Sequence, residues 1–242
     1  MQTLYAGSVA KYFDHPNDNE DRFKVVEDGR CIVVCDGASE SFDAAKWASL
    51  VTERFHEAPL SPEGLLACVE DYEAAIDPAS LSWSKQMAFE RGSFSTLSRV
   101  AVLASGTVEV TCVGDSLVVL TDGTTLLHCL PYAIAERFEE RPLLLSTLAI
   151  HNAPFMDERF MASLTQRFEV PESSVYFVLA MTDALGQWLL SRMEIGDSTA
   201  LSDLLSVRND IELSALVEHA RSEGTMRRDD STLVVAMGCN AS

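Results

Sequence analysis

The 242-residue sequence has few basic residues and no long uninterrupted apolar segment. No window contains 18 apolar residues without a charge, so we expect no transmembrane helix. The chain has only 18 basic residues but 37 acidic ones, which gives a formal net charge of −19. A surface of this sign repels nucleic-acid phosphates and anionic lipid. The composition therefore argues against nucleic-acid and membrane partners, and leaves open whether the acidity attracts cations or only serves solubility.

The six cysteines form no Cys-x-x-Cys pair, which argues against a structural zinc site. Most of them lie in apolar runs, where cysteine is typically a small core residue. We expect free thiols in a reducing compartment rather than disulfides. The positions are Cys31, Cys35, Cys68, Cys112, Cys129 and Cys239.

The sequence also lacks internal repeats, low-complexity stretches and any linker rich in Pro, Gly or Ser. Apolar residues make up 47% of the chain, which is enough for a well-buried core. We therefore expect one domain that spans residues 1–242.

Three short runs consist almost entirely of apolar residues, namely 31–35 (CIVVC), 175–181 (VYFVLAM) and 232–237 (TLVVAM). Such runs predict central strands that are covered on both faces. Further strands are predicted at residues 3–9, 22–27, 99–104, 107–113, 117–120 and 125–129. Asp-Gly pairs at 28–29 and 122–123 predict tight hairpin turns, and residues 103–106 predict another turn. Consecutive hairpins indicate antiparallel sheets.

Helical periodicity lies between these groups of strands. Residues 41–56 place Ala44, Ala48, Val51 and Phe55 on one face, and residues 62–76 begin with a Ser-Pro helix start. Helices are also predicted at 183–193 and 210–222. This order predicts an α+β fold in which sheets lie face to face with helices outside. Residues 131–160 show no clear pattern, and could form a flap near a site or further strands.

Carboxylates stand at the ends of the three apolar strands. Asp36 directly follows residues 31–35. Asp183 follows the strand at 175–181 after one intervening residue, Thr182. Asp229 and Asp230 precede the third strand. In an antiparallel sheet the start of one strand lies beside the end of its neighbour. We therefore expect these side chains to meet at one edge of the core.

The hairpin between residues 22–27 and 31–35 adds two further acidic residues. Glu20 and Asp21 precede its first strand, so the pairing places Asp21 beside Asp36. Asp115 lies in a turn between two other strands. Taken singly, each aspartate is also typical of a turn or a helix cap, but the repeated position at strand ends favours a shared site.

Carboxylates gathered at the edge of an apolar core need partners, because burial and like-charge repulsion raise their pKa values. The partners could be arginines, with Arg22, Arg99, Arg227 and Arg228 as candidates, or metal ions. A donor set made only of oxygen favours Mg²⁺, Mn²⁺ or Ca²⁺ over zinc.

Six short motifs appear in a fixed order along most of the chain, and together they resemble the protein phosphatase 2C (metal-dependent protein phosphatase) family. Their local form resembles a divergent bacterial branch of that family. The motifs are Asn19-Glu20-Asp21, Val34-Cys35-Asp36-Gly37-Ala38-Ser39, Gly92-Ser93 with Thr96, Val113-Gly114-Asp115-Ser116, Thr182-Asp183-Ala184 and Asp229-Asp230-Ser231-Thr232.

The resemblance implies an α-β-β-α sandwich of two mostly antiparallel sheets flanked by helix pairs, with Mn²⁺ or Mg²⁺ ions between the sheets. It implies hydrolysis of a phosphomonoester by a metal-activated water, as in a serine/threonine protein phosphatase. The implied partners are a phosphorylated protein and a cognate kinase. We also expect a monomer. The expected location is the cytoplasm, since Met1 to Phe13 lack the features of a secretory signal.

The resemblance also assigns roles to individual residues. Asp36 would bridge two ions, with the carbonyl of Gly37 on one of them. Asp21 would bind a metal directly or through water, and Glu20 would be an outer ligand. The implied catalytic set is Asp36, Asp183 and Asp21.

The second metal would be completed by Asp183 and Asp229. Asp115 would hold a third, weaker ion together with Asp183. Asp230 stands where the family usually has Asn, so we rank it below Asp229.

Two departures from the family pattern concern catalysis. Ala38 and Ser39 follow the Asp-Gly pair where many members have His or Met-Gly-Gly, so a histidine general acid is missing, which would be worth roughly 10²–10⁴-fold. The arginine that many members carry before Glu-Asp is also missing, and His15 stands in that stretch. The alternative interpretation is therefore a catalytically weak or inactive phosphatase-like binding module.

Overall fold

The computed structural model describes residues 1–26, 30–103, 106–170 and 174–239. Ten strands form two five-stranded sheets, in which every neighbouring pair is antiparallel. Sheet A has the order β1 (Gln2–Val9), β12 (Ser231–Cys239), β11 (Val175–Met181), β7 (Leu117–Thr121) and β8 (Leu126–Leu130). Sheet B has the order β10 (Thr165–Phe168), β6 (Val108–Val113), β5 (Leu97–Val102), β3 (Cys31–Cys35) and β2 (Arg22–Val25).

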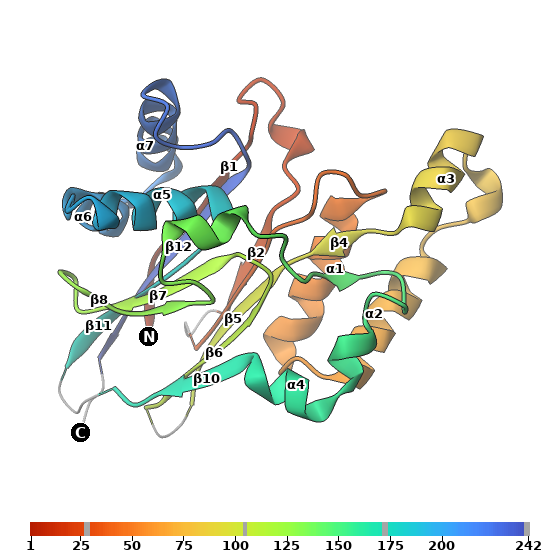
Figure 1. The fold of residues 1–242 in the computed structure, drawn as a ribbon, viewed down its shortest axis with the longest axis horizontal. Coiled ribbons are helices and arrows are strands. Elements are labelled where there is room, and N and C mark those ends of the chain that lie inside the picture. The colour runs from red at the N-terminus through yellow and green to blue at the C-terminus, as the bar shows by residue number, and fades with distance from the viewer. Residues whose placement is uncertain (27–29, 104–105, 171–173, 240–242) are drawn as a thin grey trace.

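The two sheets lie face to face, and their central strands are buried on both sides (Figure 1). Side chains alternate between the faces of a strand, and both faces are covered here, which explains why the runs are almost entirely apolar. In β3, Ile32 and Val34 pack into the core between the sheets, together with Val178 of β11. Cys31 and Val33 point to the opposite face.

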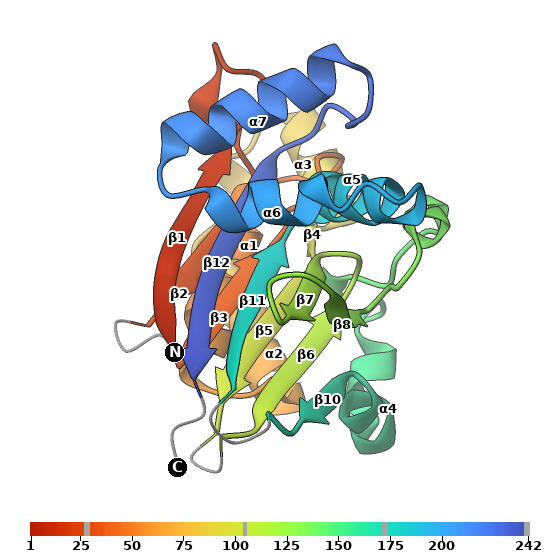
Figure 2. The same ribbon diagram turned by 90° about the vertical axis from the view of Figure 1, so that its left-hand side faces the viewer.

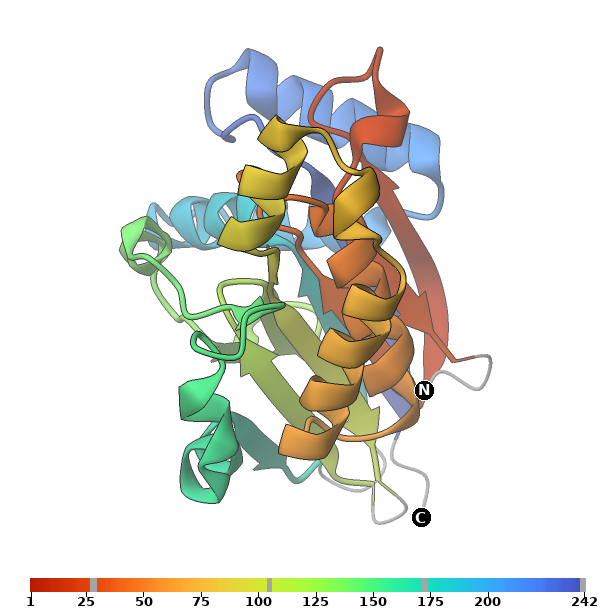
Figure 3. The same cartoon turned by 90° about the vertical axis from the view of Figure 1, so that its right-hand side faces the viewer.

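Helices cover the outer face of each sheet. Figure 2 shows α5 (Asp183–Glu194), α6 (Thr199–Ser206) and α7 (Asp210–Ser222) across sheet A. Figure 3 shows α1 (Ala44–Glu57) and α2 (Pro62–Ala74), in orange, across sheet B. Helix α3 (Trp83–Arg91) lies beyond α1 and α2, and α4 (Glu158–Ser163) lies next to β10 (Figure 1).

Short elements complete the chain. They are the strand pair β4 (Phe94–Ser95) and β9 (Leu145–Ser146), and the 3₁₀ helices η1 (Pro16–Asp18), η2 (Pro78–Ser80), η3 (Ala135–Glu139) and η4 (Ala153–Met156). The Nε1 of Trp47 in α1 donates a hydrogen bond to the carbonyl of Leu145, at 2.9 Å. This buried bond ties β9 to the helices over sheet B.

The predicted fold class, an α-β-β-α sandwich, is confirmed. The helix starts follow from their caps: the side chain of Asp43 accepts from the backbone of Lys46 at α1, and Ser61 accepts from Gly64 at α2. The turn at Asp122-Gly123 joins β7 to β8, and Gly123 has a φ of +96° that favours glycine. The predicted turns at 27–30 and 103–106 include residues outside the described part of the chain.

Three helices and three strands were not predicted, namely α3, α4, α6, β4, β9 and β10. Residues 131–160 contain the short strand β9, as one of the two interpretations expected, and also contribute residues to the cavity described below. None of the helices in the described ranges combines the length and apolar character needed to cross a bilayer.

Candidate metal and phosphate site

Strand pairing brings the predicted acidic residues to one end of the two sheets. Arg22 of β2 pairs with Cys35 of β3, so the preceding Asp21 lies beside the following Asp36. Met181 of β11 pairs with Leu233 of β12. The two segments stay in contact beyond this pair, because the backbone N–H of Thr182 donates to the carbonyl of Thr232 at 3.2 Å.

A cavity of about 900 Å³ opens at this end of the sheets. Five of the seven predicted site residues line it, and these are Asp36, Gly37, Asp115, Asp183 and Asp229. Glu20 instead lines a neighbouring cavity of about 340 Å³, which shares Lys11 and Ser39 with the first. Asp21 is buried and lines neither cavity.

Asp21 is fixed by two hydroxyl groups on sheet A. Its Oδ2 accepts hydrogen bonds from Thr182, at 3.0 Å, and from Thr232, at 2.7 Å. Its other oxygen, Oδ1, is buried without a partner. Burial raises the pKa of Asp21 to about 7, and the nearby charge of Asp230 adds to this effect. The protein thus holds a carboxyl group whose second oxygen has no donor.

Asp36 is positioned through its backbone. Its N–H donates to the hydroxyl of Thr96 at 2.8 Å, and the N–H of Thr96 donates back to the Asp36 carbonyl at 2.9 Å. Burial raises the pKa of Asp36 well above its usual value, with further contributions from Asp21 and Asp115. A charge on the Asp36 carboxylate therefore needs a cation nearby.

Gly37 sits where no side chain fits. A Cβ atom at this position would lie 2.9 Å from the carbonyl oxygens of Ala44 and Glu20. Gly37 forms a bridge to Ser95 of β4, which holds the loop after Asp36 against the sheet. Gly37 also lines the cavity, so the backbone of this loop is accessible from it.

Arg227 lies within the acidic cluster. Its Nη2 forms an ion pair with Oδ2 of Asp183, the first residue of α5. The other oxygen of Asp183 is buried and has no hydrogen-bond partner. The positive charge of Arg227 also lowers the otherwise raised pKa values of Asp36 and Asp115. Among the four arginines proposed from the sequence as partners, Arg227 is the one that contacts a predicted site residue through its carboxylate.

The other three arginines have different contacts. Arg22 donates to the carbonyls of Asn19 and Asp21, and Arg99 forms an ion pair with Glu109. Arg228 lies over the ring of Tyr12. These contacts hold loops and strands in place rather than neutralise the cluster.

Asp229 and Asp230 have different contacts, although they are adjacent. Asp229 lines the cavity and pairs with Lys11 at 3.4 Å. Asp230 is buried, and its two oxygens accept from the backbone N–H groups of Lys11, at 2.6 Å, and Glu20, at 2.7 Å. Asp230 therefore clamps two loops together with both oxygens already occupied. This geometry supports ranking it below Asp229 as a metal ligand.

The donors fit a hard divalent cation in their chemistry. Asp21 and Asp183 each present a buried oxygen without a partner, and the cluster contains only oxygen donors. Within the described ranges, however, no three Asp, Glu, His or Cys side chains are gathered closely enough to hold one metal ion. Coordination of one ion by three of these side chains would require them to move, above all Asp183, one of whose oxygens is paired with Arg227.

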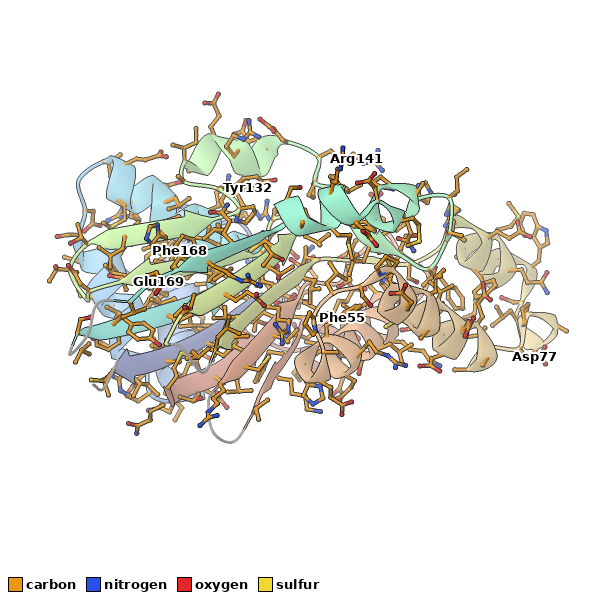
Figure 4. The ribbon with its side chains drawn as sticks, turned by 90° about the horizontal axis from the view of Figure 1, so that it is seen from below. Phe55, Asp77, Tyr132, Arg141, Phe168 and Glu169 are labelled. Carbon is orange, nitrogen blue, oxygen red and sulfur yellow. The ribbon has the colours of Figure 1, made fainter. Side chains whose placement is uncertain are left out.

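The lining of the cavity also contains basic side chains. Arg91, the last residue of α3, lines it together with Arg141 and His151. Arg141 lies on the exposed loop between η3 and β9 (Figure 4). Across the described residues, Arg91, Arg141 and Arg159 are the arginines whose side chains make no hydrogen bond, ion pair or ring contact, and two of these three line the cavity.

Comparison with solved structures shows the same fold in protein phosphatases. PppA, a regulatory component of the T6SS in Pseudomonas aeruginosa, is 17% identical, with a TM-score of 0.57 over 97% of this chain and 96% of its own. The chain has the fold of solved serine/threonine protein phosphatases. The catalytic domain of the serine/threonine protein phosphatase PstP, in complex with two manganese ions, is 15% identical, with a TM-score of 0.53 over 98% and 99%. Stp1, a serine/threonine phosphatase from Staphylococcus aureus, is 15% identical, with a TM-score of 0.55 over 96% and 94%.

No family model matches the sequence, and no curated protein matches it. Within this phosphatase fold, the sequence had not revealed the two hydroxyls on Asp21 or the cavity arginines. Thr182 directly follows β11 and Thr232 is the second residue of β12, both within the motifs, so their position offered a usable signal. Arg91 and Arg141 lie in stretches where we recognised no periodic pattern, so the sequence gave no signal that could have identified them.

Proposed function

We propose that this chain is a metal-dependent phosphomonoester hydrolase that acts on phosphoserine or phosphothreonine of a protein. One observation carries the proposal: carboxylates from strand ends far apart in the sequence line one cavity of about 900 Å³. The similarity in fold to protein phosphatases supports the reaction class. The proposal includes a single domain over residues 1–242, a monomer, a cytoplasmic location and a cognate serine/threonine kinase.

The proposed ligands of two Mn²⁺ or Mg²⁺ ions are Asp36, the carbonyl of Gly37, Asp21, Asp183 and Asp229. Asp115 would serve a third ion together with Asp183, and Glu20 would be an outer ligand. When bound, such ions lower the pKa of water so that it becomes a nucleophile at neutral pH, and they neutralise charge on the phosphoryl oxygens.

The protein's own groups position these carboxylates. Thr182 and Thr232 hold Asp21 by one oxygen and leave the other free. Thr96 fixes the backbone at Asp36 and accepts or donates a hydrogen bond with Ser116 at 2.7 Å. Such preorganisation reduces the reorganisation needed as charge develops in the transition state.

No covalent enzyme intermediate is part of this proposal. Cys35, the cysteine next to Asp36, is fully buried, and burial raises the pKa of its thiol to about 12. A thiol with such a pKa is a poor nucleophile at neutral pH. Water therefore remains the nucleophile that best fits this site.

The proposal predicts Mn²⁺-dependent hydrolysis of p-nitrophenyl phosphate. The purified protein should release p-nitrophenolate with Mn²⁺ or Mg²⁺, and lose this activity when EDTA removes the ions. The absorbance of p-nitrophenolate measures the rate. Activity that is the same with and without EDTA would reject the proposal.

The unpaired arginines of the cavity predict a preference for anionic substrates. Replacing both Arg91 and Arg141 by alanine should raise KM for a phosphopeptide with acidic flanking residues roughly fivefold, because exposed ion pairs contribute up to about 1 kcal/mol each. The effect should shrink at high salt. Arg159→Ala removes a comparable exposed arginine outside the cavity and should leave KM unchanged. Equal effects of both changes would contradict a role for the cavity arginines.

A second candidate function is a phosphatase-like module that binds a ligand without turnover. Ala38 lines the cavity where many family members have a histidine, and His15 lines the neighbouring cavity instead. The ion pair between Arg227 and Asp183 also favours this candidate. Metal binding in calorimetry together with no release of phosphate from any phosphopeptide would support it over the hydrolase.

A further inference from the structure

We propose that Arg227 is a built-in cation of the acidic cluster, and that it competes with a divalent metal ion for Asp183. The proposal deepens the proposed function, since it assumes that the cluster binds such an ion. It concerns an equilibrium between two partners of one carboxylate, and does not depend on whether turnover follows.

The contacts of Arg227 carry the proposal. Arg227 joins Oδ2 of Asp183, whose side chain is only 14% exposed. The side chain of Arg227 is 35% exposed, so part of it reaches inward from the surface. Asp183 lies at the N-terminal end of α5, where the helix dipole also favours its negative charge. This arrangement gives Asp183 a charged partner without any metal.

The surroundings of Arg227 show that its charge serves more than one carboxylate. Asp36 and Asp115 both line the same cavity, and the field of Arg227 acts on both. Unlike a divalent ion, a guanidinium group cannot be coordinated by several carboxylates at once. Its positive charge nevertheless offsets part of the repulsion among these carboxylates. The cluster is then tolerated in the fold before a metal ion binds.

The absence of a ready metal site fits this interpretation. Among the side chains of the described residues, no three acidic, His or Cys groups converge on one point. Asp183 faces Arg227 with one oxygen, and its other buried oxygen has no partner. A divalent ion that takes both oxygens would displace the guanidinium, and an ion on the free oxygen alone would place two repelling positive charges on one carboxylate.

The experiment compares Mn²⁺ binding by isothermal titration calorimetry in four proteins: wild type, Arg227→Ala, Arg227→Lys and Arg228→Ala. Arg227→Ala should bind Mn²⁺ about tenfold more tightly, because the competing charged hydrogen bond is lost. Arg227→Lys should fall between wild type and Arg227→Ala, because it keeps a positive charge without the planar group. Arg228→Ala removes the same charge at a neighbouring position and should bind like wild type.

Thermal melting in EDTA should show the opposite effect of the same change, a loss of stability instead of a gain in metal affinity. Without metal, Arg227→Ala should melt several degrees below wild type, because the cluster loses its cation, and saturating Mn²⁺ should remove the difference. If Arg227→Ala does not fold in EDTA, the comparison of Arg227→Lys with Arg228→Ala still decides the matter. Unchanged or weaker Mn²⁺ binding by both Arg227 variants would overturn the proposal.

The outcomes separate this inference from the proposed function. If wild type hydrolyses p-nitrophenyl phosphate with Mn²⁺ but the Arg227 variants bind Mn²⁺ no more tightly, the inference is wrong and the function stands. If the variants bind more tightly and none hydrolyses, the inference stands and the hydrolase proposal is wrong. If no protein binds Mn²⁺, both are wrong.

Discussion

Replacing Asp36 by asparagine is expected to reduce kcat/KM for p-nitrophenyl phosphate by at least about 100-fold, since changes to groups that only support metal ligands already cost 10–100-fold. The asparagine keeps the size of the side chain, and the backbone bonds to Thr96 do not depend on the carboxylate. The change therefore removes one charge from the centre of the cluster without disturbing the loop. Steady-state kinetics at saturating Mn²⁺ measure the effect.

The matched control for this change is Asp203→Asn, on the exposed surface of α6. It removes the same charge far from the cavity lining and should retain full activity. Melting of the metal-free protein should not fall in Asp36→Asn, because the change removes a repelling charge. If Asp36→Asn kept more than half of the wild-type activity, Asp36 would not be the central ligand.

The second large effect concerns the stability of the metal-free protein against pH. Burial raises the pKa of Asp21 from 3.8 to about 7. Between these two values the folded state binds more protons than the unfolded state, so the free energy of unfolding falls as pH rises through this window. A shift of this size is worth up to about 4 kcal/mol. The melting temperature in EDTA should thus drop by on the order of 10 °C between pH 4 and pH 8.

Asp21→Asn should reduce this pH dependence, while Asp36, whose pKa is also raised by burial, should retain part of it. The amide oxygen can still accept the hydroxyls of Thr182 and Thr232, while the amide N–H₂ replaces the oxygen that has no partner. The variant should melt several degrees higher than wild type at pH 8 in EDTA, although it loses a proposed metal ligand. Added Mn²⁺ should raise the melting temperature of wild type more than that of the variant.

Differential scanning calorimetry in EDTA from pH 4 to pH 8 measures both proteins, with Asp203→Asn as the charge control. A wild-type melting temperature that stays level or rises over this range would contradict the account. So would an Asp21→Asn protein that melts below wild type at pH 8.

The parts of the fold that follow from local rules could be predicted from the sequence. Apolar runs such as CIVVC specify buried strands by composition alone, and the Ser-Pro start of α2 is a local cap. The convergence of Asp21 and Asp36 followed from one hairpin. By contrast, β4 and β9 have two residues each, which is too short for any periodic pattern.

The sequence could not specify what individual carboxylate oxygens contact. Asp229 and Asp230 are adjacent and chemically identical, yet one lines the cavity and the other clamps Lys11 and Glu20 by their backbone. Arg227 was one of four candidate partners, and only the fold shows that it reaches Asp183. Such choices depend on positions within an ångström, which residue spacing does not encode. The metal roles of the acidic residues therefore stay predictions.

A crystal structure of the protein soaked in Mn²⁺, with anomalous difference density, would show whether the acidic cluster holds metal ions. We expect strong peaks in the cavity, with oxygens of Asp36, Asp183 and Asp229 at about 2.0–2.3 Å from them and with Arg227 turned away from Asp183. Density without a peak in the cavity, and Asp183 still joined to Arg227 at saturating Mn²⁺, would contradict this expectation.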